Sequence, residues 1–277
     1  MGVAIVSFRI VVLVKQVPAT TEVKVDPVTN NLVREGVRST VNPFDLYALE
    51  EGLRLREVYG AELIAVTMGP PQATNAMKYC LGLGYDQAVL LSDRVFAGSD
   101  TWATALVLSA AMRRIGPDLI LCGKMASDGD TAQVPPEMAE HLRIPCVTLV
   151  SRTEYLEEGT ATVLRTLSES EAEVAVSLPA VLTMEKGANN PRYPTLQGIA
   201  DTADKRVDVW RAADLGVNPS QVGALGSPTQ VVKVMPARTS ERGVVLEGIL
   251  EAQLQKIVRI LKESGALNHW KGAGGHE

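Results

Sequence analysis

The sequence contains few of the side chains that usually carry out catalysis. Its 277 residues include only three histidines, His141, His269 and His276, and three cysteines, Cys80, Cys122 and Cys146. The sequence contains no Ser/His/Asp grouping, no metal-ligand spacing and no Walker loop. A reaction that involves this chain is therefore expected to need a bound cofactor to supply the reactive atoms.

Basic charge and targeting signals are also scarce. The chain has 27 basic against 32 acidic residues, with a formal net charge of −5 and no basic stripe, so a nucleic-acid partner is not expected. The widely spaced cysteines, none in a C-x-x-C pair, predict buried thiols in a reducing cytoplasm. Residues 1–18 are apolar but contain Arg9 and Lys15, and they resemble neither a signal peptide nor a membrane span. We interpret them as a short leader followed by a core strand.

The first 150 residues alternate short apolar runs with helical patterns. Alternation of this kind, with strands apolar on both faces, predicts an α/β fold with a parallel sheet covered by helices. We expect strands at 10–14, 62–67, 87–91, 119–122 and 146–150, and helices at 43–59, 74–83, 101–115 and 133–142. Asn42 and Asp100 are the expected N-caps, and Gly60, Gly84 and Gly116 are expected to close helices.

The pattern changes after residue 150. Residues 147–152, 160–166 and 173–177 predict a small antiparallel excursion, and 180–184 a return to the core. The Gly/Pro/Asn-rich stretch 186–228 is long enough to suggest a functional loop. Residues 247–263 predict an amphipathic helix that packs on this domain or reaches a partner. We therefore expect an α/β domain over 1–235 and a C-terminal helical arm over 236–277.

Four segments are candidates for a ligand site. Parallel α/β sheets bind ligands beyond the carboxyl ends of their strands. The segments expected at that edge are 13–15, 42–45, 67–70 and 123–134. Each one also has an ordinary explanation as a helix start or a chain reversal. Together they predict a nucleotide crevice.

The stretch GKMASDGDTAQVPPE, residues 123–137, combines a strand-to-helix turn with two acidic residues. Main-chain N–H groups from 131 to 134 are expected to hold a diphosphate, with Gln133 offering a further amide donor. Asp128 and Asp130 should then turn away from the anion, into Asx-type turns or toward ribose hydroxyls. Gly129 between them allows a positive φ or a close approach of the backbone. The alternative is an elaborate solvent loop without a ligand.

Six motifs together resemble the β subunit of electron-transfer flavoproteins. They are VKQVP (14–18), DPVTNNLVREG (26–36), NPFDLYALEEGLRL (42–55), VTMGPP (66–71), GKMASDGDTAQV (123–134) and PRYPTLQGI (191–199). The resemblance implies an α/β domain similar to adenine nucleotide hydrolases, paired with an α subunit that holds an electron-carrying FAD. In common members the β subunit binds AMP without a redox role. In electron-bifurcating members it binds a second FAD, which takes hydride from NADH.

The resemblance also implies the cofactor-binding residues. The family's contacts carry over onto Leu13, Asn42, Pro43, Phe44, Asp45, Met68, Ala126, Ser127, Asp128, Gly129, Asp130, Thr131, Ala132, Gln133 and Val134, and their neighbours Val14, Gly69 and Gly123 complete the predicted site. The short DGDTAQV form lacks the Cys-Asn-Gln insertion of AMP-binding members and is similar to the bifurcating ones. Pro135 stands where those members usually have glycine.

The PRYPTLQGI segment resembles the family's recognition loop, with Leu196 as the apolar anchor and Tyr193 beside it. The alternative is a Leu196 folded onto the surface. Pro194 replaces a smaller residue and changes the expected loop shape. The partners implied are the α subunit, a dehydrogenase or quinone oxidoreductase, and ferredoxin or flavodoxin. The resemblance implies a cytoplasmic protein, with any membrane association through a partner.

Three functional hypotheses follow. In the first, the chain is a bifurcating β subunit that binds FAD and uses NADH, so that the complex is an NADH-oxidising enzyme. The second is a plain electron shuttle between a dehydrogenase and a quinone oxidoreductase, with structural AMP in this subunit. The third is a nucleotide-binding sensor without redox function. The sequence leaves open the electron acceptor and the residue that tunes the flavin.

Overall fold

The computed structural model describes residues 8–19, 39–157, 159–232, 243 and 245–266. The chain divides into two units, Met1–Val234 and Met235–Glu277, which are described separately. The DPVTNNLVREG motif, His269 and His276 lie outside the described residues.

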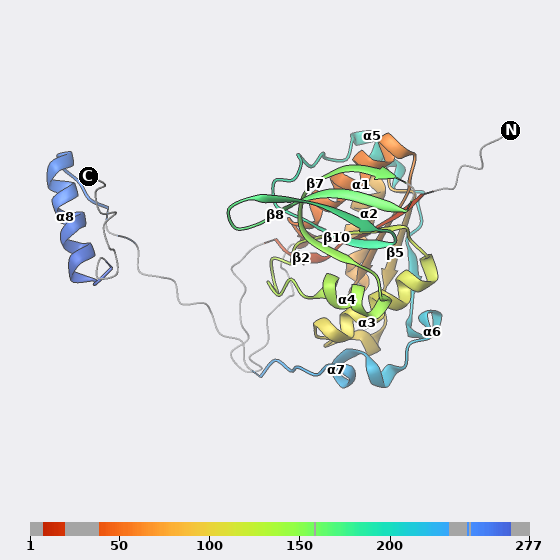
Figure 1. Ribbon diagram of the computed structural model, residues 1–277. Coiled ribbons are helices and arrows are strands. Elements are labelled where there is room, and N and C mark those ends of the chain that lie inside the picture. Colours follow the sequence, from red (N-terminus) through yellow and green to blue (C-terminus); the bar gives the residue numbers. More distant parts are fainter. Residues whose placement is uncertain (1–7, 20–38, 158, 233–242, 244, 267–277) are drawn as a thin grey trace. The chain divides into compact units, whose positions relative to one another are not determined.

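The first unit is built on a nine-stranded sheet with the order β11-β5-β4-β1-β6-β10-β7-β8-β9 (Figure 1). Its strands are β1 (Arg9–Leu13), β4 (Glu62–Met68), β5 (Gln87–Leu91), β6 (Leu119–Gly123), β7 (Cys146–Glu157), β8 (Thr160–Thr166), β9 (Glu171–Ser177), β10 (Ala180–Met184) and β11 (Asp208–Trp210). Pairing is parallel from β11 to β7 and antiparallel from β7 to β9. The short strands β2 (Gln16–Pro18) and β3 (Ser39–Val41) form a separate antiparallel pair. The α/β fold with an antiparallel excursion is therefore confirmed.

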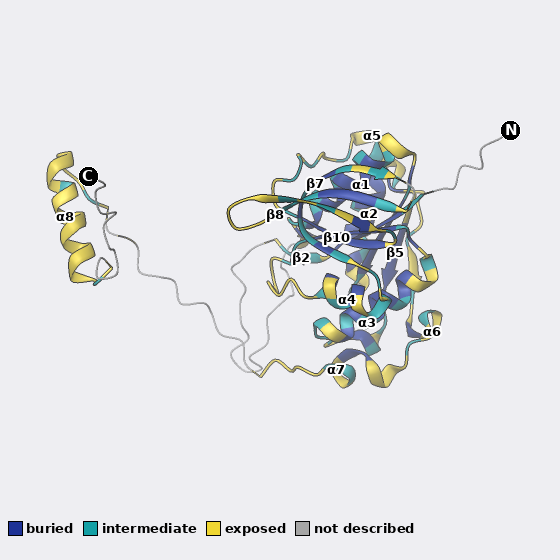
Figure 2. Ribbon diagram, viewed as in Figure 1, coloured by how far each residue is buried: buried dark blue, intermediate teal, exposed yellow. Residues whose placement is uncertain are grey.

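Helices cover both faces of the parallel part of the sheet. The longer ones are α1 (Asp45–Tyr59), α2 (Thr74–Gly82), α3 (Thr101–Ile115) and α4 (Val134–Leu142), and the shorter ones are α5 (Leu196–Asp201), α6 (Ala212–Leu215) and α7 (Gly223–Gly226), with 3₁₀ turns at Pro71–Ala73, Arg94–Phe96 and Pro219–Gln221. One buried cluster joins α1 and α2 to the sheet, and a second joins α3 and α4 to its other face (Figure 2). The strands are buried on both faces because helices cover each of them.

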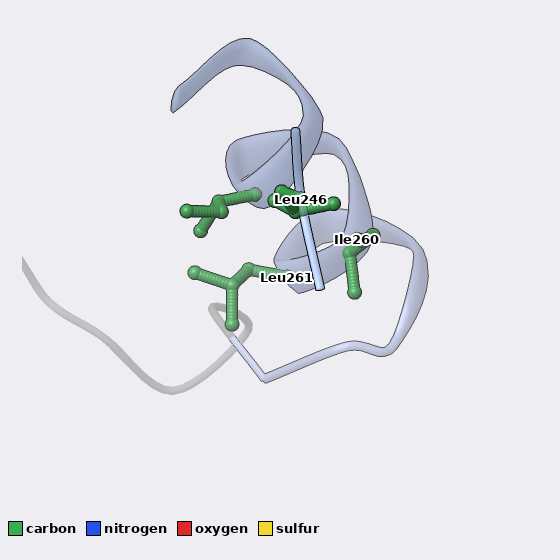
Figure 3. Close-up of a pocket in the computed structure, with 4 residues that line it drawn as sticks. Leu246, Ile260 and Leu261 are labelled. Carbon is green, nitrogen blue, oxygen red and sulfur yellow. The ribbon is translucent and has the colours of Figure 1, made fainter. Parts of the chain in front are cut away.

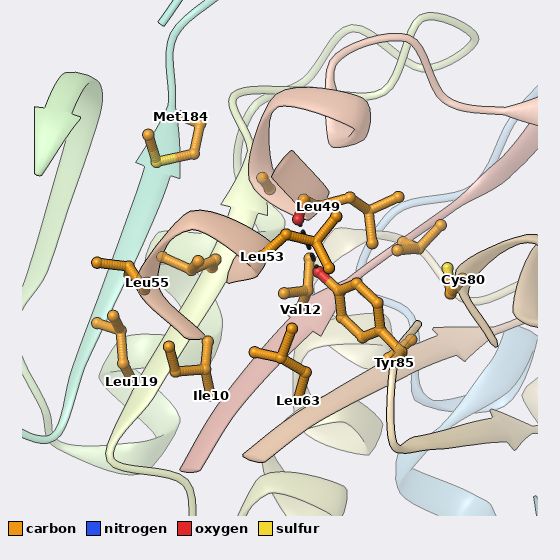
Figure 4. Close-up of a cluster of buried hydrophobic side chains, with 14 of the residues drawn as sticks. Ile10, Val12, Leu49, Leu53, Leu55, Leu63, Cys80, Tyr85, Leu119 and Met184 are labelled. Carbon is orange, nitrogen blue, oxygen red and sulfur yellow. Dashed lines mark hydrogen bonds between the residues drawn. The ribbon is translucent and has the colours of Figure 1, made fainter. Parts of the chain in front are cut away.

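Helix α1 lies especially close to the sheet. The Tyr85 hydroxyl donates a hydrogen bond of 3.0 Å to the Leu49 carbonyl (Figure 4). A Cβ on Gly52 would lie 2.8 Å from the same hydroxyl, so this turn of the helix has no room for a side chain. Leu49 and Leu53 are fully buried beside Tyr85. These contacts hold α1, and with it the segment that precedes the helix, at a fixed place on the sheet.

Several of the expected helix ends are confirmed, but the C-cap of α2 is Leu83 and not Gly84. Asp100 caps α3 by accepting a 3.0 Å hydrogen bond from the Ala103 N–H. Gly60 and Gly116 end α1 and α3 in the left-handed conformation. The prediction that Asn42 caps α1 is wrong, because the cap residue is Phe44 and its side chain makes no capping bond. The Asn42 side chain makes tertiary hydrogen bonds instead.

The C-terminal unit contains α8 (Leu250–Glu263), which begins three residues after the expected start of the helix at 247. Its apolar side chains are exposed over much of the helix (Figure 2). Leu246, Ile257, Ile260 and Leu261 line a small hollow in this unit (Figure 3). That the arm contacts a partner subunit stays a prediction. Among the described residues, no helix is both long and apolar enough to cross a membrane.

Candidate functional site

The predicted site residues gather around the carboxyl ends of β1 and β6. These two strands are adjacent, and the chain continues from β1 to β4 and β5 on one side but from β6 to β10 on the other. A crevice forms in parallel α/β sheets at such a reversal of strand order. Lys15 follows β1, and the loop from Gly123 follows β6. The reversal thus brings together segments that are more than 100 residues apart in the sequence.

Asn42 connects the start of α1 to the loop after β6. Its side-chain amide donates to Asp45 Oδ1 at 2.9 Å and to the Met125 carbonyl at 2.8 Å. Its Oδ1 accepts a 3.1 Å hydrogen bond from the Ser127 N–H, and its own N–H donates to the Lys15 carbonyl at 2.8 Å. The side chain is almost completely buried. Asn42 is therefore a cross-link between three loops.

Asp45 is a buried carboxyl at the centre of the same arrangement. Its Oδ2 accepts a 2.7 Å hydrogen bond from the Lys15 N–H. Burial raises the pKa of Asp45 to about 7, although hydrogen bonds from the Lys15 main chain and the Asn42 side chain oppose the shift. Gly123 packs directly on this carboxyl, since an added Cβ would lie 2.4 Å from Asp45 Oδ1. The end of β6 can therefore approach α1 only because residue 123 is glycine.

The two aspartates of the 123–137 loop have different roles. Asp128 Oδ1 lies 2.6 Å from the Lys15 ammonium group, in a half-exposed ion pair. Asp130 turns the chain, since its N–H donates to the Ala126 carbonyl at 2.8 Å and its φ is 52°. Neither expected Asx-type turn is present among the described residues. Asp128 thus shapes the loop through its side-chain ion pair, and Asp130 does so through its main chain.

The positive φ that glycine would allow at position 129 is found elsewhere in the loop. Asp130 and Ala132 adopt the left-handed conformation, with φ of 52° and 55°, whereas Gly129 does not. Aspartate tolerates this conformation better than most residues, but alanine does not. Ala132 therefore carries local backbone strain, and such strain is often found at functional sites.

Main-chain donors are concentrated just before α4. In the described part of the chain, the N–H groups of Thr131, Ala132, Gln133 and Val134 make no hydrogen bond to protein. Pro135 and Pro136 follow at once and bring no N–H to the first helical turn. The Gln133 side chain accepts a long hydrogen bond of 3.5 Å from the Thr101 hydroxyl. The loop thus offers four neighbouring amides in front of a helix N-terminus, where negative charge is stabilised.

Two contacts at this edge involve residues that the sequence did not single out. The Lys124 ammonium lies 2.6 Å from Glu185 Oε1 and 5.5 Å from the centre of the Phe44 ring. Glu185 directly follows β10, so its place after a core strand was the available signal. Lys124 and Glu185 connect the loop after β6 to the end of the neighbouring strand.

The remaining predicted residues are placed at the same carboxyl edge by the pairing of strands in the sheet. Leu13 and Val14 are buried in opposite faces, so at most their main chain is available to a ligand. Met68 ends β4, and Gly69, which follows it, donates to the Leu91 carbonyl at 3.1 Å. Strand register alone brings Met68 near the crevice, because β4 pairs with β1. Pro43 is exposed beside Phe44.

Among the described residues, no group of acidic, histidine or cysteine side chains is arranged to hold a metal ion.

The candidate docking residues are on the surface of the first unit. Tyr193 is 84% exposed and Leu196 is 88% exposed, so Leu196 is not folded onto the surface. Leu196 begins the short helix α5, which Thr195 caps by accepting a 2.9 Å hydrogen bond from the Gly198 N–H. Docking of a partner here stays a prediction.

The fold, with polar groups gathered beyond β1 and β6, is that of α/β proteins whose sites lie at the carboxyl edge of a parallel sheet. A family profile described as "Electron transfer flavoprotein domain" matches residues 29–215. The chain belongs to the electron transfer flavoprotein family, among its β subunits.

Similar proteins from three bacteria support this assignment. The chain is 44% identical to the electron transfer flavoprotein subunit beta of Thermoanaerobacterium thermosaccharolyticum, over 91% of this chain and 97% of that protein. It is 43% identical to the caffeyl-CoA reductase-Etf complex subunit CarD of Acetobacterium woodii, over 87% and 92%. It is 40% identical to protein FixA of Azotobacter vinelandii, over 89% and 93%.

Proposed function

We propose that the chain is the β subunit of a heterodimeric electron transfer flavoprotein that binds FAD in its crevice and takes hydride from NADH. The complex would then bifurcate electrons to a high-potential and a low-potential acceptor. An α subunit carries a second FAD. Support comes from the family, from the short loop after β6, and from the similarity to a subunit of a complex named for caffeyl-CoA reductase.

The observation that carries this proposal is the set of four amides from 131 to 134, which have no protein acceptor among the described residues, in the loop that Lys15 binds through Asp128. These amides face no competing protein acceptor among the described residues, and they match the oxygens of a phosphate group. Lys15 neutralises Asp128, so one of the loop's two carboxylates does not repel the anion. Bound FAD supplies the hydride-accepting and electron-carrying chemistry that the chain's own side chains lack.

The other predicted residues have supporting roles in this proposal. Asn42 and Asp45 use their polar atoms inside the protein, so they position the loop. Phe44 and Lys124 contribute an aromatic ring and a cation next to this loop. Met68 and Gly69 limit the crevice on the β4 side. The chain thus contributes binding and shape, and no general acid or base is assigned.

A second candidate is a non-bifurcating electron shuttle with structural AMP in this crevice. Pro135 and Pro136 have no N–H, so they limit the donors at the start of α4 to the four amides from 131 to 134. Four amides are enough for the single phosphate group of AMP, which supports this alternative. In this case the complex carries electrons between a dehydrogenase and a quinone oxidoreductase, and NADH has no role.

Coexpression with the α subunit distinguishes the two candidates. The nucleotides of the purified heterodimer are released and quantified. Two FAD per heterodimer, with bleaching of flavin absorbance by NADH, supports bifurcation. One FAD with one AMP, and no bleaching, supports the shuttle. Stable folding without an α subunit or any flavin would contradict both and favour a nucleotide sensor.

The partner surfaces follow from the same proposal. Tyr193 and Leu196 meet a dehydrogenase or quinone oxidoreductase, and the apolar side of α8 meets the α subunit. Ferredoxin or flavodoxin is the low-potential acceptor. The complex works in the cytoplasm and reaches a membrane only through a partner.

A further inference from the structure

The segment that presents Tyr193 and Leu196 is attached to the first unit on both sides. We infer that Arg192 and Gly198 hold residues 189–199 in one fixed conformation that is ready to enter an apolar pocket on a dehydrogenase. Arg192 is a positioning residue in this inference, because it acts through the neighbouring side chains. The inference rests on the proposed docking role of Leu196.

Arg192 attaches the segment to α1 through two carboxylates. Its guanidinium group donates to Glu50 at 2.7–3.1 Å and to Glu57 Oε1 at 2.5 Å. Its main-chain N–H also donates to Glu50 Oε2 at 3.0 Å. Glu50 and Glu57 lie about two helical turns apart on one side of α1, so a single side chain spans both. This geometry requires the planar fork of arginine, which a lysine cannot reproduce.

The pair with Glu50 is shielded from water more than an ordinary surface ion pair. The Glu50 side chain is 11% exposed, and the Arg192 side chain is 43% exposed. The two glutamates raise the pKa of Arg192, and Arg192 lowers the pKa of Glu57. One turn before Glu50, the Tyr47 carbonyl accepts a 2.9 Å hydrogen bond from the Asn189 side chain. Contacts from Asn189 and Arg192 therefore run along α1 from Tyr47 to Glu57, which is most of the length of the helix.

The other side of the segment is fixed by close packing on α2. An added Cβ on Gly198 would lie 2.3 Å from the Gly82 carbonyl oxygen. A Cβ on Gly82 would in turn lie 3.4 Å from Pro194 Cβ. Beyond α5, Lys205 donates to the Leu81 carbonyl at 3.2 Å. Backbone contact at Gly198 thus places α5 on the C-terminal end of α2.

Between these two attachments, Tyr193 and Leu196 are left exposed. A polar loop would suffice to connect β10 to β11, so stability of this unit does not explain why large apolar side chains stand there. A fixed apolar anchor binds more tightly than a mobile one, because the cost of ordering the loop is already met on folding. An exposed leucine with an aromatic neighbour fits a small pocket surrounded by polar residues.

The test compares R192A, R192K and G198A with L196A in the heterodimer. The acceptor is the dehydrogenase that copurifies with the heterodimer from its source, and a small dye acceptor serves as the reference reaction. We expect R192A and G198A to raise the apparent KM for the dehydrogenase about three- to tenfold, with kcat and dye reduction within about twofold. R192K should fall between R192A and the unmodified protein. R206A is the matched control, since Arg206 is 90% exposed and lies 3.7 Å from Asp208.

The outcomes separate this inference from the docking role itself. If L196A leaves KM unchanged, the docking role of Leu196 is wrong. If L196A raises KM but R192A and G198A do not, the positioning inference is overturned and docking stands. If R192A does not fold, E57Q removes one ionic contact and leaves the Glu50 pair, and it should raise KM by a smaller factor. An unchanged KM in a folded E57Q variant would then overturn the inference.

Discussion

The ammonium group of Lys15 lies 2.6 Å from the carboxylate of Asp128 and connects the end of β1 to the loop after β6. This pair neutralises Asp128, one of the two aspartates in the loop that carries the row of free amides. The carboxylate is turned toward a cation, and the amides remain available.

Replacement of Lys15 by methionine should weaken nucleotide binding without unfolding the protein. The pair is half-exposed, so stability should change by at most about 1 kcal/mol. The dissociation constant of the nucleotide should rise about tenfold, because Asp128 would then repel the phosphate. Titration of the nucleotide-free heterodimer with FAD and with AMP measures the effect. K78M, at an exposed lysine of α2, is the control, and K15M/D128N should recover part of the loss. Unchanged affinity in K15M would exclude Lys15 from the site.

Replacement by alanine should have opposite effects on stability at Gly123 and at Gly129. In G123A the new Cβ would lie 2.4 Å from Asp45 Oδ1 and 2.6 Å from the Phe44 carbonyl carbon. The start of α1 would have to move, at a cost of about 1–3 kcal/mol. In G129A the nearest atom is Lys15 Nζ at 4.0 Å, and the backbone angle suits alanine, so stability should hold or rise slightly. Urea unfolding compares them, and equal destabilisation would contradict the close contact at Gly123.

Replacement of Ala132 by glycine should stabilise the protein, whereas replacement by valine should destabilise it. Its φ of 55° costs an L-residue roughly 1–2 kcal/mol, which glycine avoids apart from its larger entropy loss. We expect A132G to gain about 0.5–1 kcal/mol in unfolding free energy. A132V should lose more than about 1 kcal/mol, because a β-branched residue fits this conformation poorly. Identical urea midpoints for A132G and A132V would show that this turn is not strained.

Asp45 should make stability depend on pH between about 4 and 7. Its folded pKa of about 7 exceeds the ordinary value of 3.8, so the folded state holds a proton that the unfolded state releases. The resulting contribution is fully present below the ordinary pKa and is lost as the pH rises through about 7. The unfolding free energy of the natural protein relative to D45N should therefore fall by up to about 4 kcal/mol over that range and then level off. Urea unfolding at several pH values checks this. A difference independent of pH would contradict it.

Much of the fold could be predicted from the sequence, because its signals are local. The apolar runs at 87–91, 119–122 and 180–184 correspond to strands within one residue of their observed ends. Asp100 is the cap of α3, because an N-cap interaction involves only the next three residues. Strand β11 was missed. Its sequence, Asp208-Val209-Trp210, has no apolar run, and its extended conformation depends on pairing with β5.

Prediction of the site's internal geometry failed where distant residues decide it. Asn42 precedes a helix and carries the right side chain for a cap, yet it binds the Met125 carbonyl 83 residues away. A buried tertiary partner outweighs the local preference. Glycine would allow a left-handed conformation at position 129, but Asp130 and Ala132 adopt it instead, and Lys15, which follows a distant strand, holds Asp128. Such long-range ties cannot be inferred from spacing along one loop.

Helix α1 touches the crevice at its first residue, Asp45, and the docking segment at Glu50 and Glu57. At a rise of 1.5 Å per residue, the span from Asp45 to Glu57 is about 18 Å. Helix α1, which is rigid, therefore sets the distance between the two regions, whereas a flexible linker would let that distance fluctuate. If Leu196 anchors a partner and the residues beyond β1 and β6 hold the cofactor, as proposed, the separation between the two would vary little from one encounter to the next, which favours uniform rates of electron delivery.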